Sequence, residues 1–163
     1  MAWVNNDGLV VLFDKEEATK AMAGEYPGAG PTRTVEVKIP ALTALAATPT
    51  LLDDFTSIPD NARIVSVKVI TDTAVTSGGS AVLNLGLRKL DRTTAIDEDG
   101  FIAALPIASF NAAGETVVLT AGVTYGGALL GTTITDAGLL YADYDTAAFT
   151  AGAIRVFIEF YIP

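Results

Sequence analysis

The sequence contains neither cysteine nor histidine, and these two absences exclude most of the common catalytic chemistry. Without cysteine there is no disulfide and no thiolate nucleophile, and without histidine there is no Ser-His-Asp triad. Standard zinc sites depend mainly on the same two residue types, so they are excluded as well. We therefore expect the fold to be held by burial of apolar side chains rather than by cross-links.

Positive charge is also scarce. The 10 lysines and arginines are outnumbered by 19 aspartates and glutamates, which gives a formal net charge of −9. The tightest basic group, Arg88, Lys89 and Arg92, is interrupted by Asp91. Phosphate backbones and anionic lipids are bound by clustered cations, so we expect neither nucleic acid nor membrane as a partner. No apolar run approaches the roughly 20 residues that a membrane helix needs.

Few groups are left that could catalyse a reaction. No serine lies in a G-x-S-x-G motif, and the glycine-rich "GGALLGTT" lacks the lysine of a phosphate-binding loop. Paired carboxylates can hydrolyse glycosidic bonds, although solvated turns explain such pairs more simply. The candidate sets are Asp53 with Asp54, Asp97 with Glu98 and Asp99, and Asp143 with Asp145, and a small carboxylate-based hydrolase would be tested at Asp97 and Asp99. We expect no enzyme, no catalytic residue and no cofactor.

The segment "DRTTAIDEDG" needs separate attention, because Asp97, Asp99 and Gly100 resemble part of a calcium loop. Pro106 stands where an EF-hand would need its glutamate. We interpret the segment as an acidic loop in solvent, expect no metal site, and leave binding of a cation by Asp97 and Asp99 open.

Apolar and polar residues alternate along much of the chain, as they do in strands with one buried face. Examples are Val35, Val37 and Ile39, then Val65, Val67 and Val69, then Leu83, Leu85 and Leu87. The "TSGGS" stretch at 76–80 predicts a tight hairpin turn between the second and third of these strands. Further strands are expected near 115–120, 139–145 and 153–163.

The last of these strands, "AIRVFIEFYIP", raises a question about its second face. One apolar face, as expected for a strand, is formed by Ile154, Val156, Ile158, Phe160 and Ile162. Phe157 and Tyr161 lie on the opposite face, which should be exposed to solvent. Either a second layer of the fold covers these rings, or they belong to an interface with another subunit, where aromatic residues are enriched.

Residues 1–31 differ in character from the remainder of the chain. "GLVVLF" could form a short strand, 14–23 could be a helix or a charged loop, and the Gly/Pro-dense 24–31 is irregular. We expect an N-terminal arm or lead-in at 1–31 and a single domain at 32–163. The candidate partner-interface residues are Trp3, Leu9, Val11, Phe13, Phe157 and Tyr161.

Short strands separated by Gly, Pro and Asp turns predict an all-β fold. The long helices that parallel crossovers require are missing from the pattern. The expected architecture is an antiparallel β-sandwich, jelly-roll-like, with an N-terminal arm.

Several longer stretches carry a resemblance to known proteins: "MAWVNNDGLVVLF", "TVEVKI", "NARIVSVKVITDTAVTSGGSAVLNLGL", "DRTTAIDEDGF" and "GALLGTTITDAGLLYADYDTAAFTAGAIRVFIEFYIP". Together they resemble the capsid decoration, or cement, proteins of tailed bacteriophages over nearly the whole chain. The resemblance implies a structural virion protein that binds the outside of the capsid and stabilises the shell by bridging capsid subunits.

The same resemblance implies partners and a location. The partner would be the major capsid protein, and the chain would be a homo-oligomer, with a trimer favoured at a threefold position. It would be synthesised in the cytoplasm of the bacterial host and end on the capsid exterior. The alternative is a receptor- or glycan-binding β-sandwich of a head fibre or adhesin, in which Tyr141, Asp143 and Tyr144 form the binding patch.

Overall fold

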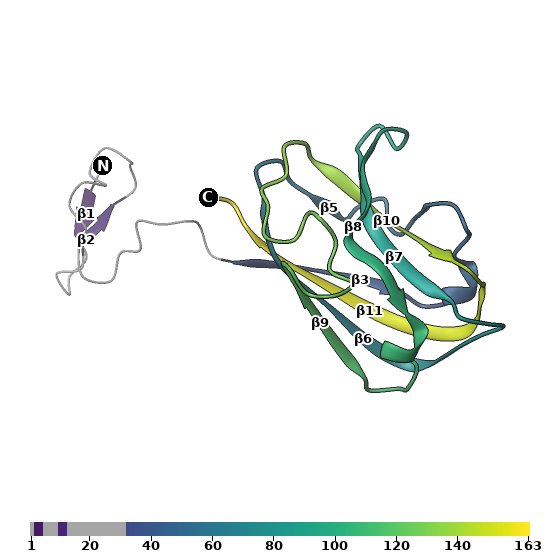
Figure 1. Cartoon of the computed structure of the whole chain (residues 1–163). Helices are drawn as coiled ribbons and strands as arrows, with labels where there is room; N and C mark the ends of the chain where they lie inside the picture. The colour runs from purple at the N-terminus through teal and green to yellow at the C-terminus, as the bar shows by residue number, and fades with distance from the viewer. Residues whose placement is uncertain (1, 5–9, 13–31) are drawn as a thin grey trace.

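Two antiparallel sheets pack face to face in this protein (Figure 1). The computed structural model describes residues 2–4, 10–12 and 32–163. Apart from the single-turn 3₁₀ segments η2 (Leu42–Ala44) and η3 (Ile107–Ser109), the regular structure of these residues is strand. None of their helical segments is long and apolar enough to cross a membrane. The expected all-β antiparallel sandwich is confirmed.

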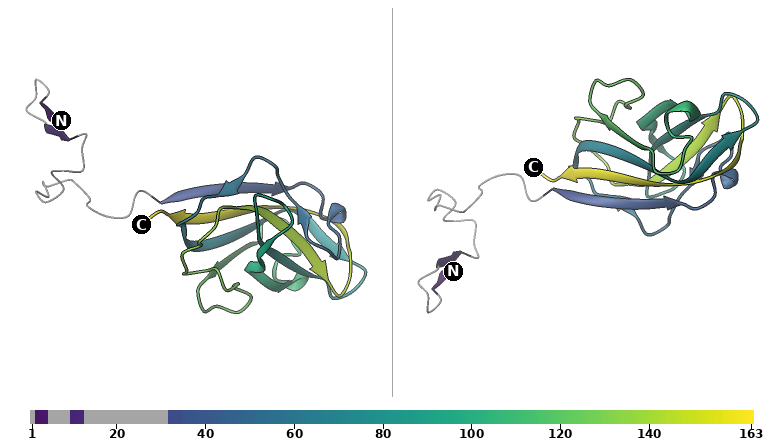
Figure 2. Two further views of the ribbon diagram at one scale, coloured as in Figure 1. Left: turned by 90° about the horizontal axis from the view of Figure 1, so that it is seen from above. Right: turned by 90° about the horizontal axis from the view of Figure 1, so that it is seen from below.

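The first sheet has four strands in the order β3-β11-β6-β9. Their bounds are β3 (Arg33–Ile39), β11 (Phe149–Tyr161), β6 (Arg63–Ser77) and β9 (Thr116–Thr120). The last strand of the chain, β11, is therefore central, and it pairs with β3 on one side and with β6 on the other. Figure 2 shows β3 and β11 side by side, with the C-terminus close to the start of β3.

The second sheet has five strands, four of them in the order β4-β10-β7-β8. Their bounds are β4 (Thr50–Leu51), β5 (Ser57–Ile58), β7 (Val82–Lys89), β8 (Ala95–Pro106) and β10 (Gly138–Asp145), and β5 also pairs with β10. The chain crosses between the sheets repeatedly, and within the sandwich formed by residues 32–163 it is the β7–β8 connection that joins two consecutive, paired strands. This alternation is consistent with a jelly-roll-like sandwich.

The core lies between the two sheets and follows the period-two pattern. Val156 and Ile158 of β11 are fully buried, as are Leu83 and Leu87 of β7 on the opposite sheet. Full burial of each such side chain stabilises the fold by about 1.5–3 kcal/mol relative to exposure. The face assignments for these two strands are confirmed.

The face assignment of β6 is wrong at its start. Ile64 is fully buried and Val65 is 38% exposed, the reverse of the expected alternation. The register explains the reversal: Glu159 pairs with Ser66 but Phe160 pairs with Ile64, so Val65 is an extra residue in a β-bulge. A bulge inverts the parity of the residues on either side of it.

The expected hairpin at residues 76–80 is also wrong. Here β6 belongs to the four-stranded sheet and β7 to the five-stranded sheet, so Gly78 and Gly79 carry the chain across the sandwich. Neither glycine adopts the positive φ that a two-residue hairpin turn requires. Because of this crossing, β6 and β7 lie in different sheets and pack face to face through their apolar sides, instead of pairing as neighbours within one sheet.

A separate two-stranded sheet lies near the N-terminus. It pairs β1 (Ala2–Val4) with β2 (Val10–Leu12), and Trp3 stands opposite Val11 in the register. The strand expected within "GLVVLF" is confirmed for its central residues. The helix or loop expected at 14–23 lies outside the described residues, and the division of the chain at residue 32 stays a prediction.

Substitutions of two glycines test the close approach of β8 to β7. A Cβ at Gly86 would lie 2.1 Å from the Asp97 carbonyl oxygen, whereas a Cβ at Gly78 would meet nothing within 4 Å. Gly86→Ala must displace backbone, so we expect a loss of about 1–3 kcal/mol in the free energy of unfolding. Gly78→Ala is the matched control and should stay within about 0.5 kcal/mol of wild type. Equal denaturation midpoints for the two variants would contradict this packing.

Candidate interface on the four-stranded sheet and its β3 edge

The outer face of the four-stranded sheet carries the aromatic rings in question. The register places Val118, Lys68, Phe157 and Glu36 opposite one another in a row across all four strands. Val118 is 56% exposed, and Phe157 is half-buried. No layer formed by residues 32–163 covers this row. Phe157 and Tyr161 therefore lie at the surface of the described body, on the same strand face.

Cationic side chains shield the Phe157 ring in place of a second layer. The Lys68 ammonium lies 5.6 Å from the ring centroid, and the Arg155 guanidinium carbon lies 5.9 Å from it. These distances are within the range of cation–π contacts. The ring is thus partly desolvated by its neighbours and remains half-buried at the surface.

The charged groups on this face are locally paired. Arg155 donates from Nε to the Asp72 carboxylate at 2.9 Å, and this hydrogen bond raises the pKa of the guanidinium above its ordinary value. Ser66 Oγ donates to Glu159 at 3.0 Å. Exposed pairs of this kind add little stability, so their main effect is to fix the side chains around the aromatic residues.

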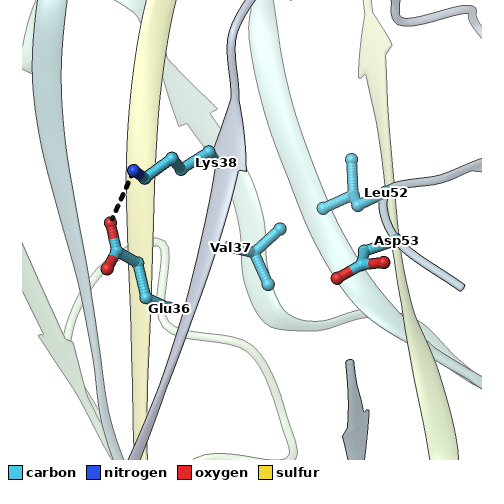
Figure 3. A pocket seen from close by; sticks show the side chains of 5 residues that line it. All are labelled: Glu36, Val37, Lys38, Leu52 and Asp53. Carbon is cyan, nitrogen blue, oxygen red and sulfur yellow. Dashed lines mark ion pairs between the residues drawn. The ribbon is translucent and has the colours of Figure 1, made fainter. Parts of the chain in front are cut away.

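A groove adjoins this face at the β3 edge (Figure 3). It has a volume of about 330 Å³ and is lined by Glu36, Val37 and Lys38 of β3 and by Leu52 and Asp53 after β4. Figure 3 shows Val37 on the side of β3 toward Leu52 and Asp53, with Glu36 and Lys38 on the other side. Among the described strands β3 pairs with β11 alone, so its second edge presents backbone groups to the groove.

The chemistry available in this groove is that of binding. The Lys38 ammonium and the Glu36 carboxylate are 4.0 Å apart, and Val37 is buried at the base. No nucleophile with an adjacent base lines it. An apolar floor with charged edges and free strand groups is suited to contact with another polypeptide.

The candidate interface residues fall into three groups. Phe157 and Tyr161 share the outer face of β11, and Trp3 and Val11 lie opposite each other on β1 and β2. Leu9 and Phe13 lie outside the described residues. The structure therefore places two of the six on one surface of the body, and their role at an interface stays a prediction.

The acidic segment is not the solvated loop expected from the sequence. Asp97 and Asp99 lie within β8, where Asp97 is half-buried. Burial raises the pKa of the Asp97 carboxyl, and a hydrogen bond and charge repulsion from Asp99 raise it further. In the part of the chain that the structure describes, no three ligating side chains are grouped to hold a metal ion.

The aromatic patch expected for a glycan binder is largely buried. Tyr141 is 5% exposed and Asp143 is 9% exposed, and the Asn84 amide donates to Asp143 at 2.8 Å. Burial raises the pKa of Asp143. Tyr144 packs edge-on against Phe149, with ring centroids 6.2 Å apart. The prediction of an exposed platform at these residues is wrong, because the strand's outer face is covered rather than solvated.

One exposed aromatic residue was missed in the sequence. Phe55 is 95% exposed in the loop between β4 and β5. Its flanking residues Asp53 and Thr56 carried the signal, since an aspartate followed by a small polar residue often closes a tight turn through its carboxylate. An aromatic residue inside such a turn has few neighbours to cover it.

Comparisons with known proteins are informative at the level of structure. No family model matches the sequence, and no curated protein matches it either. The fold is similar to a chain of the capsid asymmetric unit of cyanophage Pam1, with a TM-score of 0.59 and 18% identity over 94% of this chain and 100% of that chain.

Two further capsid structures contain similar chains. One is the capsid of Ralstonia phage GP4, with a TM-score of 0.55 and 21% identity over 87% of this chain and 90% of that one. The other is the acid-stable capsid of Helicobacter pylori bacteriophage KHP30, with a TM-score of 0.54 and 11% identity over 83% and 91%. At these identities the likeness shows a shared fold.

The Asp97–Asp99 pair gives stability a defined pH dependence. The folded-state pKa of Asp97 is raised above its ordinary value of 3.8. The contribution of Asp97 to the free energy of unfolding is therefore fully present below pH 3.8, where the carboxyl is protonated, and is lost as the pH rises through the raised pKa. We expect Asp97→Asn to raise the thermal midpoint at pH 7, with the gain shrinking as pH falls toward 3.8.

A second aspartate provides a control of opposite sign. Hydrogen bonds from Thr94 and Thr93 lower the pKa of Asp91 to about 2. The ionised Asp91 carboxylate therefore stabilises the folded state above pH 3.8, and this stabilisation is lost as the pH falls toward 2. Asp91→Asn should therefore give no gain at pH 7. A thermal midpoint of Asp97→Asn at or below wild type at pH 7 would contradict the assigned cause.

Proposed function

We propose that this chain is a structural protein of a tailed-phage virion, which binds the outside of the capsid and stabilises the shell by bridging capsid subunits. The observation that carries the proposal is the near-complete match, in both directions, between this chain and a chain of a phage capsid. Such coverage means that a capsid contains a component of the same size and fold. The chain has no histidine or cysteine, which suits a role without catalysis.

The geometry provides the means for such a role. A sandwich with its core between two sheets is rigid, and the outer face of the four-stranded sheet offers Phe157 and Tyr161 together with the β3 groove. Interfaces are enriched in aromatic residues at their centres. We assign this face to contact with the major capsid protein or with neighbouring copies in a homo-oligomer, for which a trimer at a threefold position is favoured.

The N-terminal segment extends the reach of each copy. Between Leu12 of β2 and Arg33 of β3 lie the 20 residues 13–32, which at about 3.3 Å each can span at most about 66 Å when extended. That span is enough for Trp3 and Val11 to contact an adjoining subunit. The net charge of −9 would keep the virion exterior soluble.

Substitution of Phe157 tests the sheet face. Expanded capsids of the encoding phage that lack the chain should bind wild-type protein on co-sedimentation, and Phe157→Ser should bind about tenfold or more weakly, because an aromatic contact of the proposed sheet interface is lost. Tyr125→Ser is the matched control, since Tyr125 is 39% exposed in the loop between β9 and β10. If wild-type protein stays in the supernatant at all concentrations, the proposed function is wrong.

Deletion of the first residues tests the arm. We expect that removal of residues 1–13 leaves the sandwich folded, with an unchanged midpoint of thermal unfolding, because its core consists of residues from Val37 onward. Capsid binding or self-association should weaken, measured by co-sedimentation and by light scattering. Unfolding of the truncated chain would show instead that this segment belongs to the core and that the boundary at residue 32 is misplaced.

A further inference from the structure

Phe55 is the most exposed large hydrophobic side chain among the described residues, at 95% of its full accessible surface. It lies in the segment between β4 and β5, where Asp53 also lines the β3 groove. Single exposed apolar residues are ordinary. Phe55 differs because the loop around it is held in place by two independent sets of contacts.

The first set lies within the loop. One oxygen of the Asp53 carboxylate accepts the backbone N–H of Phe55 at 2.9 Å, and the other accepts the hydroxyl of Thr56. These hydrogen bonds lower the pKa of Asp53, so the carboxylate is charged at neutral pH. The backbone that bears the ring is therefore fixed before any partner arrives, which reduces the entropy lost on binding.

The second set joins the loop to the turn between β7 and β8. The Asp54 carboxylate lies 3.0 Å from the Arg92 guanidinium. That turn is itself closed by Asp91, which accepts the backbone N–H groups of Thr93 and Thr94 at 2.8 Å. Leu90, in the same turn, is 56% exposed. Two structured turns, linked by this ion pair, thus expose an aromatic and an aliphatic side chain on the five-stranded sheet.

We propose that Phe55 is the anchor by which this chain docks on the capsid shell, inserting into an apolar pocket of the shell protein whose rim carries lysine or arginine. The inference rests on the proposed function and names the contact that it uses. The stretch "LDDFTSIPD" contains three aspartates and no basic residue. Asp54 is neutralised by Arg92, whereas Asp53 keeps an uncompensated charge beside the ring, and a cationic rim would complement it.

The same charges disfavour a second copy as the occupant. Two Phe55 loops meeting each other would bring their Asp53 carboxylates together, on chains that each carry a net charge of −9. Like charges placed opposite each other weaken an interface. The anchor therefore faces a different protein, and contacts between copies belong to other surfaces.

Phe55→Ser tests the anchor on the full-length chain. Because the side chain is exposed, the substitution should leave the thermal midpoint and the oligomeric state unchanged. Binding to capsids that lack the protein should weaken about tenfold or more, whereas Phe55→Leu should recover part of the loss. Tyr125→Ser, which also removes an exposed aromatic ring, should bind as wild type does.

The outcomes separate the anchor from the function on which it rests. Binding of Phe55→Ser within twofold of wild type overturns the anchor while capsid binding itself stands. A changed oligomeric state of Phe55→Ser in light scattering overturns the choice of partner, since a second copy would then be the occupant. Failure of wild-type protein to bind removes both proposals together.

Salt and Asp53→Asn test the cationic rim. The amide oxygen of asparagine can still accept the Phe55 N–H, and its NH2 group can donate to the Thr56 hydroxyl in place of the bond that the carboxylate accepted, so the turn is kept while the charge is removed. We expect weaker binding of Asp53→Asn at low salt and a shallower salt dependence than wild type. Binding equal to wild type at every salt concentration overturns the basic rim.

Discussion

Burial of two apolar strand faces against each other is the interaction on which this protein depends. A chain without cysteine cannot lock its fold with disulfides, so the contact between β11 and β6 on one sheet and β7 and β10 on the other must carry the stability. Because β11 is central, the last strand of the chain completes the four-stranded sheet. The four-stranded sheet is therefore complete only when β3 and β11, from the two ends of residues 32–163, are paired.

Because the core between the sheets carries the stability, the outer faces of the two sheets can differ from each other in the side chains that they expose. On the four-stranded sheet, Phe157 lies beneath the charged groups of Lys68 and Arg155, on the strand next to the edge strand β3. On the five-stranded sheet the outer face is filled by Tyr141, Asp143 and Asn84, which are buried and hydrogen-bonded. The outer face of the four-stranded sheet therefore leaves an aromatic ring half-buried at the surface, whereas that of the five-stranded sheet is largely buried apart from its exposed turns.

Strand faces could be predicted from the sequence wherever period two held without interruption, as in β11 and β7. The assignment failed at Val65, because a bulge is set by the partner strand rather than by local pattern. The hairpin at Gly78 failed for a related reason: the pattern shows where the chain turns but not which sheet each strand joins. Most strands of this sandwich pair with partners far along the chain, and a single sequence carries no direct signal of those pairings.

The candidate site was predicted only in part. The aromatic residues on the second face of the last strand were identified from the sequence, because Phe157 and Tyr161 stand on a strand face where polar residues are expected. Phe55 was missed, since exposure of one residue in a short loop depends on what the rest of the fold leaves uncovered. Tyr141 and Asp143 looked like a surface patch because their burial under neighbouring segments is a property of the folded chain alone.

The central claim is that this chain works by adhesion to a phage shell, and imaging of the virion itself tests it most directly. Electron cryomicroscopy maps of particles from the encoding phage would be compared with maps of particles from a phage with the gene deleted. The account predicts sandwich-sized density on the outside of the shell that is lost in the deletion, with particles that rupture more easily on heating. Identical maps and identical thermal resistance would contradict it.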